Sequence, residues 1–240
     1  MNPPAPRTVK LAPMQRFAAE HLQRSQREAV AVTLHGVADA EALLALRDAC
    51  AARAAPARVT LTHLVVKAVA QALRAHPGLN ATLTGDEVQL HPGVHIGLAL
   101  ALPDGSLIVP VLRDADRLSI GELAATAHDL GERARCGRLR LPDVQGATFT
   151  VSNGGAQASV RWTTPIIPLG QAAILGLGAM HAQPVVHGGA VVVRRVLPTS
   201  LSFDHRFVNG VPAARFLDEL HQLFAEPGLI RLDGPPPKES

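Results

Sequence analysis

The stretch TSLSFDHRFVNGVPAARFLDELHQLF, residues 199–224, contains both kinds of element that decide the fold. Residues 199–203 form an apolar segment that is typical of a strand, and Pro212 suits the first turn of the helix that follows. His205 and Asn209 lie in the polar segment between them. A strand that leads through a short loop into a helix is the pattern of an α/β protein.

The rest of the chain repeats these signals with added hairpins. Capping residues and apolar periodicity predict helices over residues 12–26, 41–53, 63–76 and 120–135, with Asp39, Thr62 and Ser119 as caps. Strands are predicted over residues 29–37, 94–102, 107–111, 147–151, 172–180, 184–187 and 190–196, with a hairpin turn at Gly188 and Gly189. We therefore expect an α/β fold with a mixed β-sheet faced by helices, formed by one domain over residues 10–232 between a disordered leader (1–9) and a disordered tail (233–240).

Composition excludes several classes of protein. Hydrophobic residues make up 47% of the chain and aromatic residues 3%, so the core is expected to consist of Ala, Val, Leu and Ile. The net charge is only +3, and the densest basic cluster, RCGRLR at residues 135–140, has no aromatic residue near it, which argues against nucleic-acid binding. The sequence contains no uncharged apolar stretch of about 18 residues, so no membrane-spanning helix is predicted. Cys50 and Cys136 form no disulfide framework, so a cytoplasmic location is expected.

Two strand ends carry candidate catalytic residues. His205 follows a strand and precedes a helix, and a histidine there can accept a proton from a thiol or hydroxyl near neutral pH. Ser152 follows another strand in TFTVSNGG, residues 148–155, where its hydroxyl could donate to an oxyanion and the glycines let the backbone approach a ligand. From the residues alone, a histidine satisfied by backbone groups and a serine in a simple turn remain open alternatives.

Metal and dinucleotide sites are not expected. His91 and His95 have the spacing of helical metal ligands, but Pro92 and Gly93 between them oppose a continuous helix, and no cysteine or carboxylate cluster completes a site. The segment GLGAMH, residues 176–181, lacks the third glycine and the helix of a dinucleotide loop.

Taken together, these stretches resemble the catalytic domain of the E2 components of 2-oxo acid dehydrogenase complexes, the dihydrolipoamide acyltransferases, which share a fold with chloramphenicol acetyltransferase. The family's Asp-His-Arg motif with its later Asp or Asn and Gly stands here as DHRFVNG, residues 204–210. Its other motifs stand in the same order as PVLRDAD (110–116), TFTVSN (148–153) and QAAILG (171–176). The similarity runs from about Leu11 to Leu232, which is nearly the whole chain.

The resemblance implies a role for each matching residue. His205 would be the general base that takes the proton from the thiol of coenzyme A, and Ser152 would donate to the oxyanion of the tetrahedral intermediate. Asn209, where most members have aspartate, would hold the histidine loop. The family's partner arginines are replaced here by Gln15 and His21, so we expect a neutral pairing of Asn209 with one of these residues.

The resemblance also implies partners. The family forms trimers in which His205 of one chain would face Ser152 of the next, and the polar end GPPPKES favours a homotrimer over a larger core. Only about ten residues precede the first helix, so either the chain is an excised domain or the lipoyl group would be supplied in trans, by a separate lipoyl-domain protein beside the E1 and E3 dehydrogenase components. Coenzyme A would be a substrate, and no metal, membrane or nucleic acid is expected.

Three functions follow from these residues. The first is transfer of an acyl group between a dihydrolipoyl thiol and coenzyme A, in a dihydrolipoamide acyltransferase. The second keeps coenzyme A and uses a small acceptor other than a lipoyl group, which the missing lipoyl domain favours. The third is a non-catalytic core subunit, which the presence of both His205 and Ser152 opposes. The identity of the acyl group, whether acetyl, succinyl or branched-chain, stays open.

Overall fold

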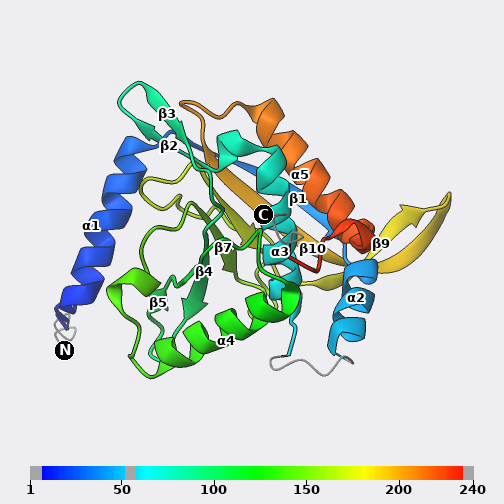
Figure 1. The fold of residues 1–240 in the computed structure, drawn as a ribbon, viewed down its shortest axis with the longest axis horizontal. Coiled ribbons are helices and arrows are strands. Elements are labelled where there is room, and N and C mark those ends of the chain that lie inside the picture. The colour runs from blue at the N-terminus through cyan, green and yellow to red at the C-terminus, as the bar shows by residue number, and fades with distance from the viewer. Residues whose placement is uncertain (1–6, 52–57, 235–240) are drawn as a thin grey trace, which may run out of the picture.

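The computed structural model describes residues 7–51 and 58–234, in which helices alternate with strands (Figure 1). The helices are α1 (Pro13–Glu28), α2 (Glu41–Ala51), α3 (Leu61–Ala75), α4 (Ile120–Arg135) and α5 (Gly210–Ala225), with short 3-10 turns at Pro77–Leu79, Leu141–Asp143 and Pro227–Leu229. The strands are β1 (Ala31–Asp39), β2 (Ala81–Thr84), β3 (Glu87–Leu90), β4 (Ile96–Ala101), β5 (Leu107–Ile108), β6 (Val111–Leu112), β7 (Phe149–Asn153), β8 (Ala173–Leu177), β9 (His181–His187) and β10 (Ala190–Asp204). The predicted leader and tail lie largely outside the described residues.

One mixed sheet organises the molecule. Its strands follow the order β1-β10-β8-β7-β4-β5, while β6 pairs with β4 and β9 pairs with β10. β10 is antiparallel to both β1 and β8, whereas β4, β7 and β8 are parallel to one another. Helices α3, α4 and α5 lie in front of the sheet in Figure 1. The prediction of a mixed sheet faced by helices is therefore confirmed.

The two faces of the sheet differ in chemistry because side chains alternate along each strand. On β10, Leu201 and Phe203 point into the hydrophobic core. Their neighbours Ser200 and Ser202 are equally buried but point to the opposite face, where Ser202 Oγ lies 2.7 Å from Thr33 Oγ1. The apolar face thus holds the helices, and the opposite face carries hydroxyl groups.

The core is aliphatic around a phenylalanine centre, which composition alone did not predict. Four of the six phenylalanines, Phe149, Phe203, Phe216 and Phe224, are completely buried. Each such side chain contributes about 1.5–3 kcal/mol to stability by leaving water. The predicted apolar stripe of α3 is also buried, from Leu64 to Ala72.

One charged side chain is enclosed in this core. Lys67 on α3 is 1% exposed, and its Nζ donates to the backbone carbonyls of Asp116 (3.1 Å) and Leu118. Burial lowers the pKa of this amine, while nearby carboxylates partly oppose that effect. Lys67 therefore ties α3 to the loop that leads into α4.

Several local predictions need correction. α3 is capped by Thr60, not Thr62, because Thr60 keeps an extended backbone and its Oγ1 accepts the His63 N–H at 3.3 Å. The strand expected over residues 107–111 is divided into β5 and β6. The β2–β3 hairpin was not predicted, although Gly85 at its turn has a φ of 59°.

Two apolar surfaces lie outside the core. On α1, Phe17 and Leu22 are 60% and 47% exposed. The ribbon formed by β9 and the first part of β10 projects from the body (Figure 1), and Val186, Val191 and Val193 on it are each more than 70% exposed. Neither surface is covered by residues that the structure describes.

Candidate active site

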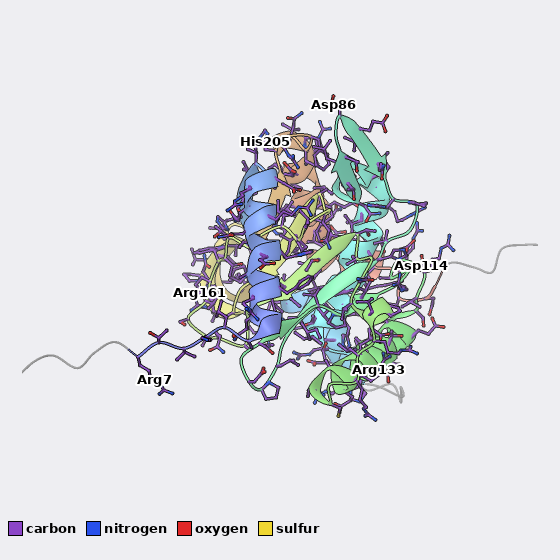
Figure 2. The ribbon with its side chains drawn as sticks, turned by 90° about the vertical axis from the view of Figure 1, so that its left-hand side faces the viewer. Arg7, Asp86, Asp114, Arg133, Arg161 and His205 are labelled. Carbon is purple, nitrogen blue, oxygen red and sulfur yellow. The ribbon has the colours of Figure 1, made fainter. Side chains whose placement is uncertain are left out.

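The backbone of His205 is fixed where β10 ends. Its N–H donates to the carbonyl of Val30 at 2.8 Å, which joins it to the residue before β1. The imidazole ring lies 5.7 Å from the ring of Phe203, centroid to centroid, and is exposed to solvent. Figure 2 shows His205 beyond the end of α1. The residue therefore presents a free ring on a firmly held backbone.

Asp204 supports the same turn from the interior. Its side chain is almost fully buried and accepts hydrogen bonds from the backbone N–H groups of Val30 (3.3 Å) and Arg206 (3.1 Å) and from the Arg206 guanidinium (2.6–3.0 Å). Burial alone would raise the pKa of Asp204, but the hydrogen bonds and charge of Arg206 outweigh it and hold the pKa below its usual range. The carboxylate thus stays ionised and orders the residues on both sides of His205.

Ser152 lies at the other end of the sheet. It is half-buried near the end of β7, between Ala99 of β4 and Gly176 of β8. The next residue, Asn153, donates its side-chain amide to Thr62 Oγ1 at 2.9 Å. Ser152 is therefore presented from a paired strand beside the first turn of α3.

The strand register separates the two candidate residues. Ser152 pairs with Gly176, and Gly176 pairs with Ser200 on β10. His205 follows Ser200 by five residues, so the two backbones are about 17 Å apart along the strands and about 10 Å apart across them. The structure does not bring His205 and Ser152 together within one chain, so a site that uses both needs a second chain.

Asn209 occupies the N-cap of α5, where its carbonyl accepts the N–H of Ala213 at 3.3 Å but its side chain does not cap the helix. Its backbone is extended, its side chain makes no capping hydrogen bond, and the residue is exposed. Gln15 instead accepts from the N–H of Ala12, and the His21 ring lies 5.0 Å from that of Phe17. Among the described residues of one chain, no hydrogen bond joins Asn209 to Gln15 or His21, so the expected pairing is not made within the chain.

A cavity of about 610 Å³ opens beside Ser152 at the N-terminus of α3, and we call it the α3 cavity. Its polar and cationic lining comprises Arg58, Thr60, Thr62, His63, His128, Arg135 and Asn153, and its apolar lining comes mainly from β4 and α4. Burial, with a smaller effect from His128, lowers the pKa of His63 to about 4. At neutral pH His63 therefore adds no positive charge, and the cavity has the cationic groups Arg58 and Arg135, of which Arg135 is paired with Glu132, beside the N-terminus of α3.

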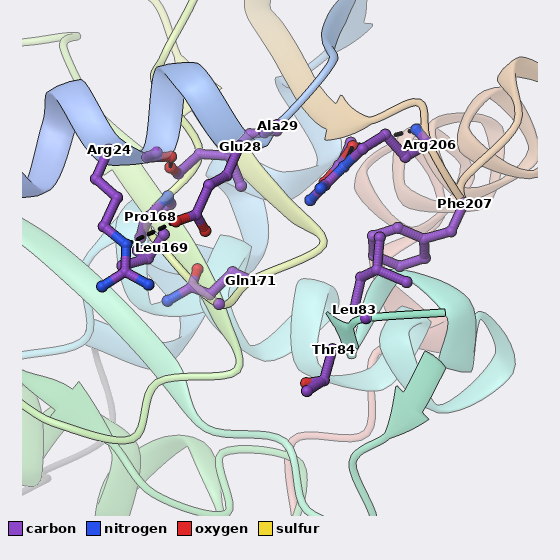
Figure 3. A pocket seen from close by; sticks show the side chains of 15 residues that line it. Arg24, Glu28, Ala29, Leu83, Thr84, Pro168, Leu169, Gln171, Arg206 and Phe207 are labelled. Carbon is purple, nitrogen blue, oxygen red and sulfur yellow. Dashed lines mark hydrogen bonds and ion pairs between the residues drawn. The ribbon is translucent and has the colours of Figure 1, made fainter. Parts of the chain in front are cut away.

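A second cavity, of about 370 Å³, lies beside the His205 loop between α1 and the β2–β3 hairpin (Figure 3). Arg24 and Glu28 form an ion pair on one side of it, at 2.6 Å, and the Asp204–Arg206 pair lies on another. Leu83 and Phe207 supply apolar contacts. Each of its arginines has a carboxylate partner, which reduces the positive charge of this cavity.

The remaining candidate residues have structural partners. His91 Nε2 lies 2.9 Å from Thr82 Oγ1, and His95 Nδ1 accepts the Asp114 N–H at 3.0 Å. Within residues 7–51 and 58–234, no three metal-binding side chains converge. In the same ranges no helix combines the length and the apolar character that a membrane crossing requires.

Sequence reasoning missed the cationic groups of the α3 cavity and the link from Asn153 to Thr62. Thr60 and Thr62 precede an apolar helix and could have marked its first turn as a polar rim. Nothing in the sequence showed that this turn meets the end of β7, because the two segments are 91 residues apart.

The comparisons with known proteins agree with this geometry. The family model described as 2-oxoacid dehydrogenases acyltransferase (catalytic domain) matches residues 3–232. The acetyltransferase component of the acetoin cleaving system from Bacillus subtilis is 37% identical over 93% of this chain and 56% of its own length. The succinyltransferase component of the 2-oxoglutarate dehydrogenase complex from Haemophilus influenzae is 34% identical over 95% of this chain and 56% of its own.

Solved structures give the same result. The cubic core of a pyruvate dehydrogenase multienzyme complex superposes with a TM-score of 0.87 at 37% identity, over 95% of this chain and 99% of that one. The Azotobacter vinelandii dihydrolipoamide acetyltransferase, studied for the role of a serine, a histidine and an asparagine in its catalytic mechanism, gives 0.86 at 36% identity with the same coverage. Chloramphenicol acetyltransferase, at 14% identity over 85% of this chain and 94% of that one, shares the fold with a TM-score of 0.55.

The fold and the two strand-end motifs define an α/β protein of the chloramphenicol acetyltransferase-like class. Within that class, the chain belongs to the family of 2-oxoacid dehydrogenase acyltransferase catalytic domains. It spans about half the length of the curated relatives that it matches.

Proposed function

We propose that this chain is a dihydrolipoamide acyltransferase that moves an acyl group between a dihydrolipoyl thiol and coenzyme A. The observation that carries the proposal is the presence of Ser152 and His205, each at the end of its own strand, in a chain whose close structural relative was studied for the same residue types. Residues 10–232 form the catalytic domain, and the lipoyl group carries the acyl group to it.

His205 acts as the general base. A thiol with an ordinary pKa of about 8.5 is mostly protonated at neutral pH, so a positioned imidazole increases the fraction that can attack the acyl group. The thiol sulfur forms a bond to the acyl carbon while its proton passes to His205, and the proton then goes to the departing dihydrolipoyl sulfur. The exposed ring and fixed backbone of His205 suit this proton transfer at an interface with a neighbouring chain.

Ser152 stabilises the negative charge that develops on the acyl oxygen. A hydroxyl aimed at an oxyanion contributes about 2.7–4 kcal/mol to transition-state stabilisation in comparable sites. Asn209 holds the histidine loop by bonding to a neighbouring chain, since its exposed side chain makes no hydrogen bond with the described residues of its own chain.

The α3 cavity is the candidate site for coenzyme A. Its volume of about 610 Å³ lies in the range of ordinary ligand pockets. Arg58, Arg135 and the N-terminus of α3 favour phosphate groups, and Asn153, the residue after Ser152, also lines the cavity.

The active form is a homotrimer with the site between chains. Two chains are needed to join His205 with Ser152, and the uncovered apolar residues on α1 and on the β9–β10 ribbon offer surface for association. We place the enzyme in the cytoplasm, with a lipoyl-domain protein and E1 and E3 dehydrogenase components as partners, and favour an isolated trimer.

The test is formation of acyl-coenzyme A from acylated dihydrolipoamide. We expect the wild-type protein to catalyse this transfer, and His205→Ala and Ser152→Ala to lose on the order of a hundredfold in kcat. Glu226→Ala, which changes an exposed residue at the C-terminal end of α5, is the control and should keep full activity. Equal rates for His205→Ala and the wild-type protein would show that the base is assigned wrongly.

A further inference from the structure

The side chain of Asn153 joins the end of β7 to two other segments. Its Nδ2 donates to Thr62 Oγ1 at 2.9 Å, and its Oδ1 accepts the N–H of Gly155 at 2.8 Å. Asn153 directly follows Ser152, and side chains alternate along a strand, so the amide extends from the face opposite to the Ser152 hydroxyl. The amide can therefore fix the backbone of Ser152 without occupying the space in front of its hydroxyl.

Thr62 is a firm point of attachment. It lies in the first turn of α3, a helix of 15 residues capped by Thr60. The residues that follow, Leu64, Val65 and Val66, have no exposed surface, so the start of this helix is anchored in the core. A hydrogen bond to Thr62 thus ties Asn153 to a helix whose start is anchored in the core.

The turn after Ser152 closes tightly on the same amide. Gly154 N–H donates to the carbonyl of Leu177 at 2.9 Å. A Cβ atom on Gly155 would lie 2.8 Å from Asn153 Oδ1 and 2.9 Å from the carbonyl oxygen of Gly178, so only glycine fits there. The turn is therefore packed around the Asn153 side chain and leaves it little freedom.

We propose that Asn153 and Thr62 are positioning residues for the acyl transfer, because together they fix Ser152 at the place where it meets the oxyanion. The inference rests on the oxyanion role of Ser152 proposed above. A displacement of about 1 Å at a reacting group can cost a hundredfold in rate. The loss of this single hydrogen bond, with the strand pairing kept, should displace Ser152 by less and lower kcat about tenfold.

The first test compares Asn153→Ala, Thr62→Ala and Thr62→Ser in steady-state acyl transfer. The two alanine variants should lower kcat about tenfold and leave KM for coenzyme A within about twofold, whereas Thr62→Ser should keep wild-type kcat because its hydroxyl remains. The double variant should be no slower than the slower single variant, because Asn153→Ala already removes the hydrogen bond that Thr62→Ala removes, together with the one from Gly155. The proposal would be overturned if the kcat losses of the two single variants multiply in the double variant, or if the variants change only KM. Either result would indicate direct contact with coenzyme A in the α3 cavity.

The second test removes Ser152 itself. In a Ser152→Ala background, Asn153→Ala should cause no further loss of kcat, since the amide acts through the hydroxyl that is already gone. A further tenfold loss would overturn the positioning role. If Ser152→Ala alone is fully active, the oxyanion assignment fails instead, and if Ser152→Ala is inactive while Asn153→Ala and Thr62→Ala are unimpaired, only the positioning role fails. Thr62→Val, which keeps the shape of the side chain, replaces Thr62→Ala should the latter fold poorly.

Discussion

At the residue scale, the order of the His205 turn depends on one buried carboxylate. Asp204 is 2% exposed, and its oxygens are satisfied by Arg206 and by two backbone N–H groups. Removal of the arginine would leave a buried negative charge without its partner, which is far more costly than loss of a surface ion pair. The pairing of Arg206 with Asp204 thus explains why an arginine follows the histidine in the motif, without any role for Arg206 in the chemistry.

His63 should make the stability of the protein depend on pH. Its pKa is about 4 in the folded protein and near 6.5 when unfolded, so the unfolded chain binds more protons between these values. Stability is therefore complete above pH 6.5 and decreases as the pH falls toward 4, by on the order of 2 kcal/mol. Urea unfolding of the wild-type protein and His63→Gln at pH 7 and pH 4.5 measures this.

The glutamine variant should lose less stability on acidification than the wild-type protein, because it has no proton to gain. Glutamine also suits its place in the first turn of α3, where it can accept the N–H of Thr60 as His63 Nδ1 does. An equal loss of stability in both proteins would contradict the assignment of this pH dependence to His63.

At the element scale, the segment over residues 160–165 packs directly on two glycines at the end of β8. A Cβ on Gly178 would lie 1.9 Å from the carbonyl oxygen of Arg161, and one on Gly176 would lie 2.5 Å from Thr163 Oγ1. The N–H of Ala179 also donates to the carbonyl of Val160 at 2.7 Å. The glycines of QAAILGLG therefore make room for the backbone of residues 160–165 and do not form a nucleotide-binding loop.

Gly178→Ala should destabilise the protein by more than about 2 kcal/mol, because the backbone at Arg161 must move to admit the methyl group. Gly121→Ala is the matched control. A Cβ there meets no atom within 4 Å, and alanine favours the helical conformation of α4. Thermal unfolding should show a clear decrease in Tm for the first variant and no decrease for the second, and equal Tm values would refute the close packing.

Local rules predicted most elements and failed where tertiary contacts decide. The capping box of Ser119 and Glu122 and the glycine turn at residues 188–189 were recognised because their geometry is set by neighbours in sequence. The cap of α3 was misplaced by two residues because either threonine offers the same hydroxyl. Strands 1 and 10 pair across more than 150 residues, which no local pattern encodes.

The site could be predicted only in part, because it also depends on tertiary contacts. His205 and Ser152 could be named from their motifs, because strand ends followed by glycine or by a helix are marked in the sequence. Their separation across the sheet follows from the register of three strands, and the α3 cavity follows from the meeting of α3, β4 and α4. Neither can be derived from one segment alone.

At the scale of the whole molecule, the separation of Ser152 and His205 means that the proposed catalysis requires an assembly of chains. Two inactive variants, His205→Ala and Ser152→Ala, should restore activity when their chains are mixed within trimers. A site that takes His205 from the second variant and Ser152 from the first is intact, and random mixing makes about one quarter of sites intact.

Co-expression of differently tagged variants, followed by purification and the acyl transfer assay, measures this complementation. A mixture of separately assembled trimers is the control and should stay inactive until the chains exchange. Activity that never rises above that of either parent would contradict a site between chains, and light scattering on the same samples reports the number of chains in each particle.

The enclosure of Lys67 gives the protein a built-in reporter of unfolding. Only three lysines occur in the chain, and the other two, Lys10 and Lys238, are close to its ends in sequence. The amine of Lys67 is shielded by the core and engaged by two carbonyls, so an amine-reactive label can reach it only when α3 separates from the loop before α4. The rate at which that single peptide acquires label, followed by mass spectrometry, therefore records how often the centre of the molecule opens.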